Sequence, residues 1–401
     1  MMPSGEDTRD PQELHEQARR LLIDGDPAAA RKVLERAVAQ APRHLPYWLS
    51  LAAALRALGS HDEEFTALER ALALDPTHLV VLLQKGALLD LMHKPRAAAT
   101  VYGRAVQTLA PGTRLPPQVE SHVRHAHKRI EENAAVLADA LDKRLGSLRQ
   151  GEMQGAQLRF DRCLDRLLGR RRIFVPEPTF MLFPYLRNYE FFDREHFPWL
   201  AGVESATEAI RDELLGVLKA DQPGLQPYIA FNEGLPLRQW TELNHSRRWS
   251  AYFLWNQGRI EQSHLARCPR TTAALASVPQ VDIPGRGPTA FFSILEARTK
   301  IPAHSGVTNT RLTVHLPLIV PPSCGFRVGG ETREWRIGTG WVFDDTIEHE
   351  AWNDSDAPRA VLIFDVWNPQ LTALERDLVR ETTVALQEYH EGEGYVPGVE
   401  I

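Results

Sequence analysis

The stretch RLTVHLPLIV (311–320) decides how the second half of this 401-residue chain is read. Successive residues of a β-strand point to opposite faces, so the two faces can be separated by counting. One face carries Leu312, Val314, Leu316 and Leu318, and the other carries Arg311, Thr313 and His315. An arginine and a histidine behind a wholly apolar face must line water or a polar cavity. The stretch therefore predicts one wall of a β-structure with a polar interior.

The surrounding sequence extends this pattern. From about residue 176, short runs rich in aromatic and β-branched residues are broken by Pro and Gly. The predicted strands are 250–259, 289–297, 311–320, 325–330, 333–338, 340–345 and 359–367, with one helix at 205–220. Several short strands between turn signals are typical of a sandwich or barrel. In the last strand, Arg359 and Asp365 lie on the less apolar face, as Arg311 and His315 do in theirs.

The first third of the chain repeats itself. The segments ERAVAQAP, ERALALDP and GRAVQTLAP end at Pro42, Pro76 and Pro111, spacings of 34 and 35 residues. A period near 34, with Gly at the turn, small residues at the helix crossing and Pro after the second helix, resembles the tetratricopeptide repeat. We expect three repeats over about 11–111, within a repeat domain at 1–115.

The predicted repeat domain is followed by a helical linker at 116–175 and a β-rich domain at 176–401. Apolar residues in the linker recur at three- and four-residue intervals, which indicates an amphipathic helical stretch over 118–168. We interpret His122, His125 and His127, which lie in it among charged residues, as part of a solvated face rather than a metal cluster.

Composition limits the partners and the compartment. A net charge of −6 argues against a general nucleic-acid binder, and no apolar stretch is long enough for a membrane span. The N-terminus is polar and acidic, without a secretory signal, and the three cysteines are scattered, so we expect a cytoplasmic protein. The excess of Arg over Lys indicates a GC-rich, bacterial genome. The repeats offer a surface for a peptide or protein partner; the alternative is an array that only docks on its own catalytic domain or self-associates.

Two histidines flank the predicted strands. His304 lies in a loop before 311–320, and His349 lies before the loop leading to Arg359. Ferrous iron takes imidazole and oxygen ligands with open positions, and an arginine fork suits the far carboxylate of 2-oxoglutarate. The constellation therefore indicates an iron- and 2-oxoglutarate-dependent oxygenase. Gly306 stands where the usual third ligand, a carboxylate, is expected, which leaves open a site completed by water or a degenerate fold without iron.

These residues lie in longer familiar segments. HSGVTNTRLTVHLPLIVP and GWVFDDTIEHEAWNDSDAPRAVLIFDVWNP resemble the aspartyl/asparaginyl β-hydroxylase family, as do WSAYFLWNQGR and AFFSILEARTKIPAHSG upstream. The resemblance covers roughly 176–370. It implies an α-helical repeat solenoid followed in the sequence by a double-stranded β-helix (jelly-roll) oxygenase domain. It also implies dependence on Fe(II), 2-oxoglutarate and O2. It also implies glycine in place of the third iron ligand, in agreement with Gly306.

The resemblance assigns roles to seven residues. They are iron ligands at His304 and His349, 2-oxoglutarate contacts at Trp249, Ser293, His315 and Arg359, and a substrate-side catalytic contact at Arg311. One departure matters, because the family usually has a second arginine at the position of Thr313. That arginine helps to hold carboxylates, so the charge preference for the substrate is open.

Acidic residues crowd the second histidine. They are Asp344, Asp345, Glu348 and Glu350. We interpret them as solvated turn carboxylates; the alternatives are that one accepts the second N–H of the histidine or binds the metal.

The function implied is hydroxylation of an aliphatic carbon, foremost the β-carbon of Asp or Asn in a peptide or protein. Two alternatives are hydroxylation of a lipid acyl chain or small molecule, and a catalytically silent scaffold in which the repeats carry the function.

Overall fold

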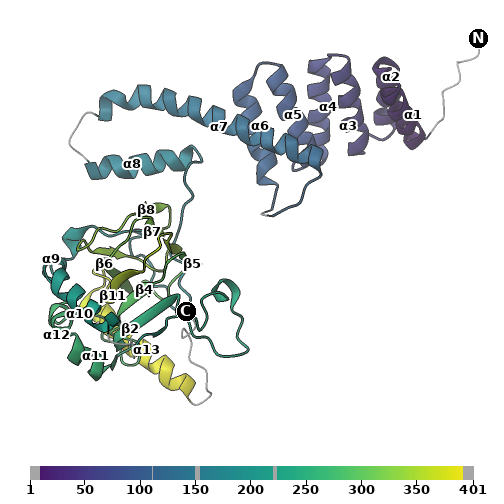
Figure 1. The fold of residues 1–401 in the computed structure, drawn as a ribbon. Helices are drawn as coiled ribbons and strands as arrows, with labels where there is room; N and C mark the ends of the chain where they lie inside the picture. Colours follow the sequence, from purple (N-terminus) through teal and green to yellow (C-terminus); the bar gives the residue numbers. More distant parts are fainter. Residues whose placement is uncertain (1–9, 111, 150–153, 220–223, 392–401) are drawn as a thin grey trace, which may run out of the picture. The chain divides into compact units, whose positions relative to one another are not determined.

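The computed structural model describes residues 10–110, 112–149, 154–219 and 224–391, and divides into two compact units at 1–170 and 171–401 (Figure 1). Each unit has its own hydrophobic core. No helix in these described ranges combines the length and the apolar character needed to cross a membrane.

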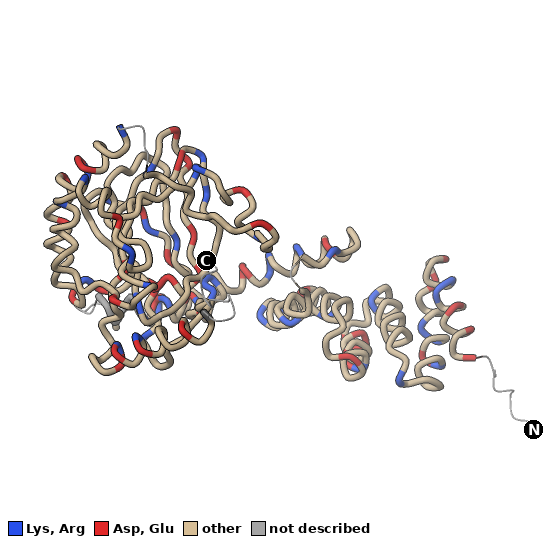
Figure 2. The backbone as a smooth tube through the Cα atoms, turned by 90° about the horizontal axis from the view of Figure 1, so that it is seen from below, with Lys and Arg blue, Asp and Glu red and all other residues tan. Residues whose placement is uncertain are grey.

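The first unit confirms the helical repeats. Within residues 10–110 the helices are α1 (Pro11–Ile23), α2 (Pro27–Gln40), α3 (Leu45–Ala57), α4 (His61–Leu74), α5 (Leu79–Leu91) and α6 (Pro95–Gln107). Gly25 and Gly59 turn at positive φ, and His93 adopts the same left-handed conformation in the third repeat. Pro111, which ends the third repeat in the sequence, lies outside the described residues. Acidic and basic residues are interspersed along these helices (Figure 2).

The segment expected to be a linker forms two helices and a short 3-10 turn. They are α7 (Pro117–Leu145), η1 (Gly146–Arg149) and α8 (Gln154–Leu167). Val123 and Ala126 of α7 belong to the core of the repeat array, so this part of the helix packs on the array. All three histidines of α7 are exposed, as predicted, although His125 contacts Asp90.

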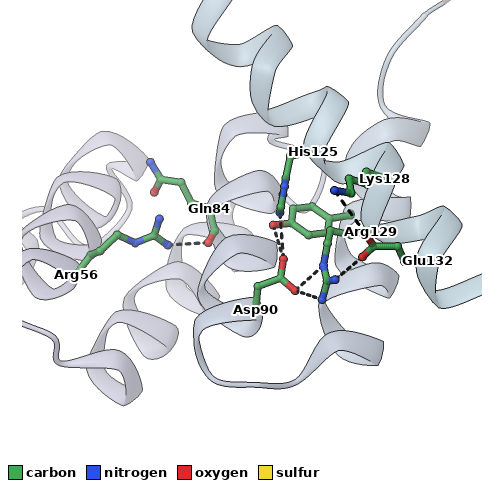
Figure 3. A network of polar contacts seen from close by, with 8 residues as sticks. Arg56, Gln84, Asp90, His125, Lys128, Arg129 and Glu132 are labelled. Atoms are coloured by element: carbon green, nitrogen blue, oxygen red, sulfur yellow. Dashed lines mark hydrogen bonds and ion pairs between the residues drawn. The ribbon is translucent and has the colours of Figure 1, made fainter. Parts of the chain in front are cut away.

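Asp90 joins α7 to the third repeat (Figure 3). Its carboxylate accepts hydrogen bonds from Tyr102 Oη at 3.2 Å and from Arg129 Nε and Nη2 at 3.0 and 2.8 Å. His125 Nε2 lies 3.3 Å from the same carboxylate, and Arg129 also pairs with Glu132. Because several donors converge on one half-buried acceptor, the network should contribute more than an isolated surface pair.

We therefore expect Asp90→Ala to destabilise the repeat array by about 1–2 kcal/mol, since it leaves Tyr102 and Arg129 without their acceptor. Thermal unfolding followed by circular dichroism measures this. Asp139→Ala is the matched control, because Asp139 pairs with Lys143 in a largely exposed contact and its loss should cost less than about 0.5 kcal/mol. Equal effects of the two substitutions would contradict the assignment.

The second unit contains two antiparallel sheets, as the double-stranded β-helix prediction requires. Within the described residues, the large sheet has seven strands in the order β1-β2-β4-β11-β6-β9, with β3 on β2, and the small sheet has the order β5-β10-β7-β8. The large-sheet strands are β1 (Gln226–Pro227), β2 (Trp249–Asn256), β3 (Arg259–Ile260), β4 (Ala290–Leu295), β6 (Arg311–Ile319), β9 (Trp341–Phe343) and β11 (Arg359–Trp367). The small-sheet strands are β5 (Thr299–His304), β7 (Cys324–Val328), β8 (Glu331–Arg333) and β10 (His349–Asn353).

Helices cover the outer face of the large sheet. They are α9 (Leu200–Ser205), α10 (Thr207–Lys219), α11 (Gln262–Arg267) and α12 (Pro269–Leu275), and α13 (Ala373–Glu391) follows the last strand; η2 (Arg194–His196) and η3 (Arg238–Trp240) are single turns. Leu312, Leu316 and Leu362 are fully buried in the core formed with these helices. The apolar faces predicted for β6 and β11 thus point outward to the helices, and their polar faces point inward between the sheets.

Two local predictions failed. Residues 334–338 form no strand, since β8 ends at Arg333, whereas the predicted helix at 205–220 is confirmed as α10, which runs from Thr207 to Lys219. Strands β5 and β10 were not predicted at all. His304 is therefore the last residue of β5 rather than a loop residue, and His349, predicted to lie just before a loop, is the first residue of β10.

Candidate active site

A cavity of about 390 Å³ lies on the inward face of the large sheet. All seven residues assigned from the sequence line it: Trp249, Ser293, His304, Arg311, His315, His349 and Arg359. They come from β2, β4, β5, β6, β10 and β11, so the fold assembles in one place what the sequence spreads over more than a hundred residues.

Strand register fixes the order along the cavity. Strands β6 and β11 are antiparallel, with His315 opposite Ile363 and Thr313 opposite Asp365. Arg359 begins β11, six residues before Asp365, which places the two about 20 Å apart at the usual rise of a strand. The cavity therefore has an Arg359 end and an Arg311–Asp365 end.

His304 and His349 are register partners in adjacent strands, with ring centroids 4.1 Å apart. Nδ1 of His304 donates to the Pro302 carbonyl at 2.8 Å, and Nδ1 of His349 donates to the Ile347 carbonyl at 3.1 Å. Since a carbonyl can only accept, each Nδ1 carries the proton and each Nε2 keeps a free lone pair.

Both imidazoles are neutral. Burial lowers the pKa of His304 well below its usual value and that of His349 to about 4. Two neutral imidazoles oriented by backbone carbonyls fit a divalent transition metal. Among the described residues no group of three or more His, Cys, Asp or Glu side chains is placed to hold a metal, so the protein would supply these two ligands and leave other positions open.

The opposite wall carries a buried cation. Arg359 is 1% exposed, its Nε and Nη1 make no hydrogen bond to any described residue, and its guanidinium lies 4.5 Å over the Trp335 ring. Burial lowers the pKa of Arg359 to about 10, because no carboxylate compensates the charge. A buried guanidinium with open donors fits a carboxylate such as that of 2-oxoglutarate.

Neighbouring residues complete this end. Trp249 Nε1 donates to Oγ of the fully buried Ser293 at 3.1 Å. Nδ1 of His315 is buried without a partner among the described residues, and burial lowers the pKa of this imidazole well below its usual value. His315 in β6 and Ser293 in β4 lie on the two strands that flank Arg359 in β11, where an incoming polar molecule could satisfy the open Nδ1 of His315.

At the Arg311–Asp365 end of the cavity, opposite charges of the protein's own side chains neutralise each other. Arg311 forms an ion pair with Asp365, and Thr313 Oγ1 donates to Asp345 Oδ2 at 3.2 Å. The prediction of solvated carboxylates is wrong for Asp344 and Asp345, which are buried at 2% and 9% exposure. Neither carboxylate accepts the N–H of His349, because that N–H goes to a backbone carbonyl.

Two of the four acidic residues near His349 instead belong to the outer face of the small sheet. Glu348 and Glu350 pair with Arg327 at 2.9 and 2.6 Å. Lys300 adds a second cation to Glu350 at 2.7 Å. These ion pairs hold strands β5, β7 and β10 together and leave the cavity to Asp345.

A steric restriction explains why position 306 is a glycine. A Cβ at this position would lie 2.3 Å from Cγ of Asp345, so the Asp345 carboxylate occupies the space that a side chain would need. The backbone of Gly306 also donates to the Asp345 carbonyl at 2.6 Å. The Asp345 carboxylate, from the turn before β10, thus occupies the space next to the histidine pair. A third metal ligand at position 306 would need the same space.

We expect Gly306→Ala to destabilise the protein by about 1–3 kcal/mol through this overlap. The Gly306→Ala/Asp345→Ala double variant should cost at least about 1 kcal/mol less than the sum of the single variants, because removing the carboxylate frees the space. Denaturant unfolding measures the free energy of unfolding of the three variants. Additive effects of the two substitutions would contradict the predicted overlap between position 306 and Asp345. Gly103→Ala, at an open helical position, should be neutral or stabilising.

Sequence reasoning missed two aromatic residues at the site: Tyr228, which lines the cavity, and Trp335, whose ring lies under the Arg359 guanidinium. Tyr228 stacks on Trp249 at 4.1 Å and packs against Phe291 at 5.2 Å, and Trp335 stacks on Trp341 at 5.8 Å below Arg359. Burial raises the pKa of the Tyr228 hydroxyl, so it stays protonated. Both residues lie where no regular strand pattern marks them: Tyr228 follows the two-residue β1, and Trp335 lies after β8.

Comparison with known proteins agrees with this geometry. Residues 204–369 match the family model for aspartyl/asparaginyl beta-hydroxylase, and residues 45–88 match a tetratricopeptide repeat model. The chain is 32% identical over 216 residues to the ornithine lipid ester-linked acyl 2-hydroxylase of Rhizobium tropici, covering 51% of this chain and 72% of that protein. The fold and the site define a β-hydroxylase-type domain that follows helical repeats in the sequence. The chain belongs to the aspartyl/asparaginyl β-hydroxylase family.

Other relatives match over less of their length. The human aspartyl/asparaginyl beta-hydroxylase is 34% identical over 175 residues, which are 43% of this chain and 22% of that protein, and the mouse protein is matched over 19% of its length. The chain thus spans about a fifth of these relatives. Among solved structures, the SycD chaperone of Yersinia enterocolitica aligns with 32% of this chain and 84% of its own, at 15% identity and a TM-score of 0.28.

Proposed function

We propose that the protein is a 2-oxoglutarate-dependent, Fe(II)-dependent hydroxylase of an aliphatic carbon. The observation that supports it best is the pairing of two neutral histidines with a buried, uncompensated Arg359 across one cavity. A cavity that had lost its cofactors would have no reason to keep an unpaired guanidinium buried, because that burial costs free energy.

Each of the chain's own residues then has a task. His304 and His349 would hold the metal through Nε2, while Arg359 and Ser293 would hold the far carboxylate of 2-oxoglutarate, with His315 and Trp249 beside it. Bound iron would supply the activation of O2, and the overall reaction converts R–H, O2 and 2-oxoglutarate into R–OH, succinate and CO2. Trp249 and Tyr228, whose rings stack 4.1 Å apart in the cavity wall, would limit the access of water to the cavity.

Two substrate classes follow from the names of relatives. One is the Asp or Asn side chain of a peptide, which the repeat array could present, and the other is the acyl chain of a lipid, the named substrate class of the Rhizobium relative. The alternative to an enzyme is a catalytically silent scaffold in which the repeats carry the function.

The test is metal- and cosubstrate-dependent turnover. Purified full-length protein with Fe(II), ascorbate and 2-oxoglutarate should release succinate and CO2 slowly without substrate and faster with a cognate one, and the product should be 16 Da heavier than the substrate. A protein that binds neither Fe(II) nor 2-oxoglutarate by calorimetry would support the scaffold instead.

A further inference from the structure

The Arg359 guanidinium lies over the face of an aromatic ring. Its central carbon is 4.5 Å from the centre of the Trp335 ring, and Trp335 is itself buried at 5% exposure. Arg359 lines the cavity, whereas Trp335 is not among the described residues that do so. A ring face attracts a cation without taking up the N–H donors that lie in the guanidinium plane. The contact with Trp335 therefore leaves those donors available to a carboxylate.

Neighbouring rings fix the plane of the Trp335 indole. The ring of Trp341 in β9 lies 5.8 Å from it at an interplanar angle of 13°, and the ring of Phe326 in β7 lies 5.5 Å away at 25°. The imidazole of His315 in β6 lies 6.2 Å away at 28°. Strands from both sheets thus hold the indole through near-parallel ring contacts.

The turn that carries Trp335 is attached to one of these strands. It joins β8 to β9, and the backbone N–H of Gly338 in this turn donates to the carbonyl of Pro317 in β6 at 3.1 Å. Gly338 adopts a left-handed φ of 75°, which a glycine tolerates without strain. A residue outside any strand therefore has a defined position behind Arg359.

A fixed ring under a flexible side chain lowers the cost of binding a ligand. The long side chain of an arginine loses rotamer freedom when its guanidinium clamps a carboxylate. A guanidinium that already lies on a fixed ring has lost part of that freedom before the ligand arrives, and this preorganisation raises the affinity of the site. The affinity for a carboxylate should therefore depend on Trp335, although the cavity is lined by Arg359.

We propose that Trp335 is a positioning residue of the cosubstrate site, whose ring holds the Arg359 guanidinium in the orientation that binds the far carboxylate of 2-oxoglutarate. The inference rests on the proposed function for the identity of that carboxylate. Arg359 is the group that contacts the carboxylate, and Trp335 acts through it.

Two substitutions separate the ring face from the rest of the indole. Trp335→Phe keeps a ring under Arg359 and removes an N–H that no described residue accepts, whereas Trp335→Leu removes the ring. Full-length protein is titrated with 2-oxoglutarate in the presence of Mn(II) and without O2. We expect about tenfold weaker binding for Trp335→Leu and a change below about threefold for Trp335→Phe, with the affinity for Mn(II) unchanged in both.

Turnover with Fe(II) should divide in the same way. In Trp335→Leu the KM for 2-oxoglutarate should rise about tenfold while kcat stays within about twofold of the wild type, because only the binding of the cosubstrate is weakened. A loss of Mn(II) affinity as large as the loss of 2-oxoglutarate affinity would mean that the substitution disturbs the whole cavity, and would overturn the proposal.

A double-mutant cycle shows whether Trp335 acts through Arg359. In the Arg359→Met background, Trp335→Leu should change the Kd for 2-oxoglutarate by less than about twofold. Trp352→Leu is the control, because this half-buried ring covers Gly325 on the face of β10 opposite to His349, and it should leave the Kd unchanged. A tenfold loss in both backgrounds overturns the proposal.

An NMR measurement tests the position of Arg359 without metal or cosubstrate. In protein labelled with 15N-arginine, the Arg359 Nε–H signal is assigned by its loss in Arg359→Met, and the ring current of Trp335 should shift it upfield. The shift should persist in Trp335→Phe and in Trp352→Leu and disappear in Trp335→Leu. An unshifted signal in the wild type overturns the proposal even if Trp335→Leu does not fold.

The two kinds of failure are distinguishable. A wild type that shows the shifted signal but binds no 2-oxoglutarate would reject the proposed function, and Trp335 would then be only a structural support of Arg359. Unchanged 2-oxoglutarate affinity in a folded Trp335→Leu variant would leave the proposed function standing and overturn this inference.

Discussion

His349→Ala is expected to abolish metal-dependent consumption of 2-oxoglutarate, with a loss of at least about 100-fold in metal affinity. Loss of an outer-shell partner alone costs about 10–100-fold, and His349 is one of only two side chains that the described residues offer to the metal. Its partner His304 faces it at 4.1 Å but cannot chelate alone. Calorimetric titration with Mn(II) and succinate release with Fe(II) measure the two parts of the effect.

The substitution should leave the fold intact. The His349 imidazole donates a hydrogen bond to the carbonyl of Ile347, and the backbone pairing of β10 with β5 and β7 does not depend on the side chain. His122→Ala, on the exposed face of α7, is the control and should change neither metal affinity nor turnover. Retained metal affinity in the His349 variant would place the metal elsewhere.

The polar interior explains which strands the sequence could predict. Strands β6 and β11 are recognisable because their outward faces are unbroken apolar rows against the helices. In β10 the buried positions include His349 and Asn353, and Asn353 bonds to backbone carbonyls of Leu295 and Glu296. Strand β5 contains Pro302 and ends on His304. Polar groups at inward positions thus reverse the usual pattern at the strands that carry the metal ligands.

Other features depend on contacts between distant segments. That Asp345 is buried against Gly306, rather than solvated, follows only once the turn before β10 is folded against the end of β5. Likewise, Arg311 and Asp365 could each be placed on an inward face from the sequence. Their pairing requires the antiparallel register of β6 and β11, which sets Thr313 opposite Asp365. Strand faces were therefore predictable, but the charge balance of the cavity was not.

Arg359→Met is expected to separate binding from stability. It should raise the KM for 2-oxoglutarate about 100-fold, because each charge-assisted hydrogen bond to the carboxylate contributes about 1.5–3 kcal/mol. The cofactor-free protein should at the same time become more stable, by about 1–3 kcal/mol. The buried guanidinium has no counter-ion among the described residues, and its pKa, lowered by burial to about 10, shows that the folded environment disfavours the charge.

Melting curves with and without 2-oxoglutarate distinguish this from a merely structural role. The wild-type Tm should rise with 2-oxoglutarate, since a ligand at 100 times its Kd stabilises by about 2.7 kcal/mol, whereas the variant should start a few degrees higher and not respond. Arg327→Met is the matched control: its guanidinium is paired with Glu348 and Glu350, so its loss should lower the Tm and leave the KM unchanged. A cofactor-free Tm that falls in the Arg359 variant would mean that stacking on Trp335 stabilises the fold more than the unpaired charge destabilises it. The buried cation would then be a structural element of the barrel rather than a site kept open for a carboxylate.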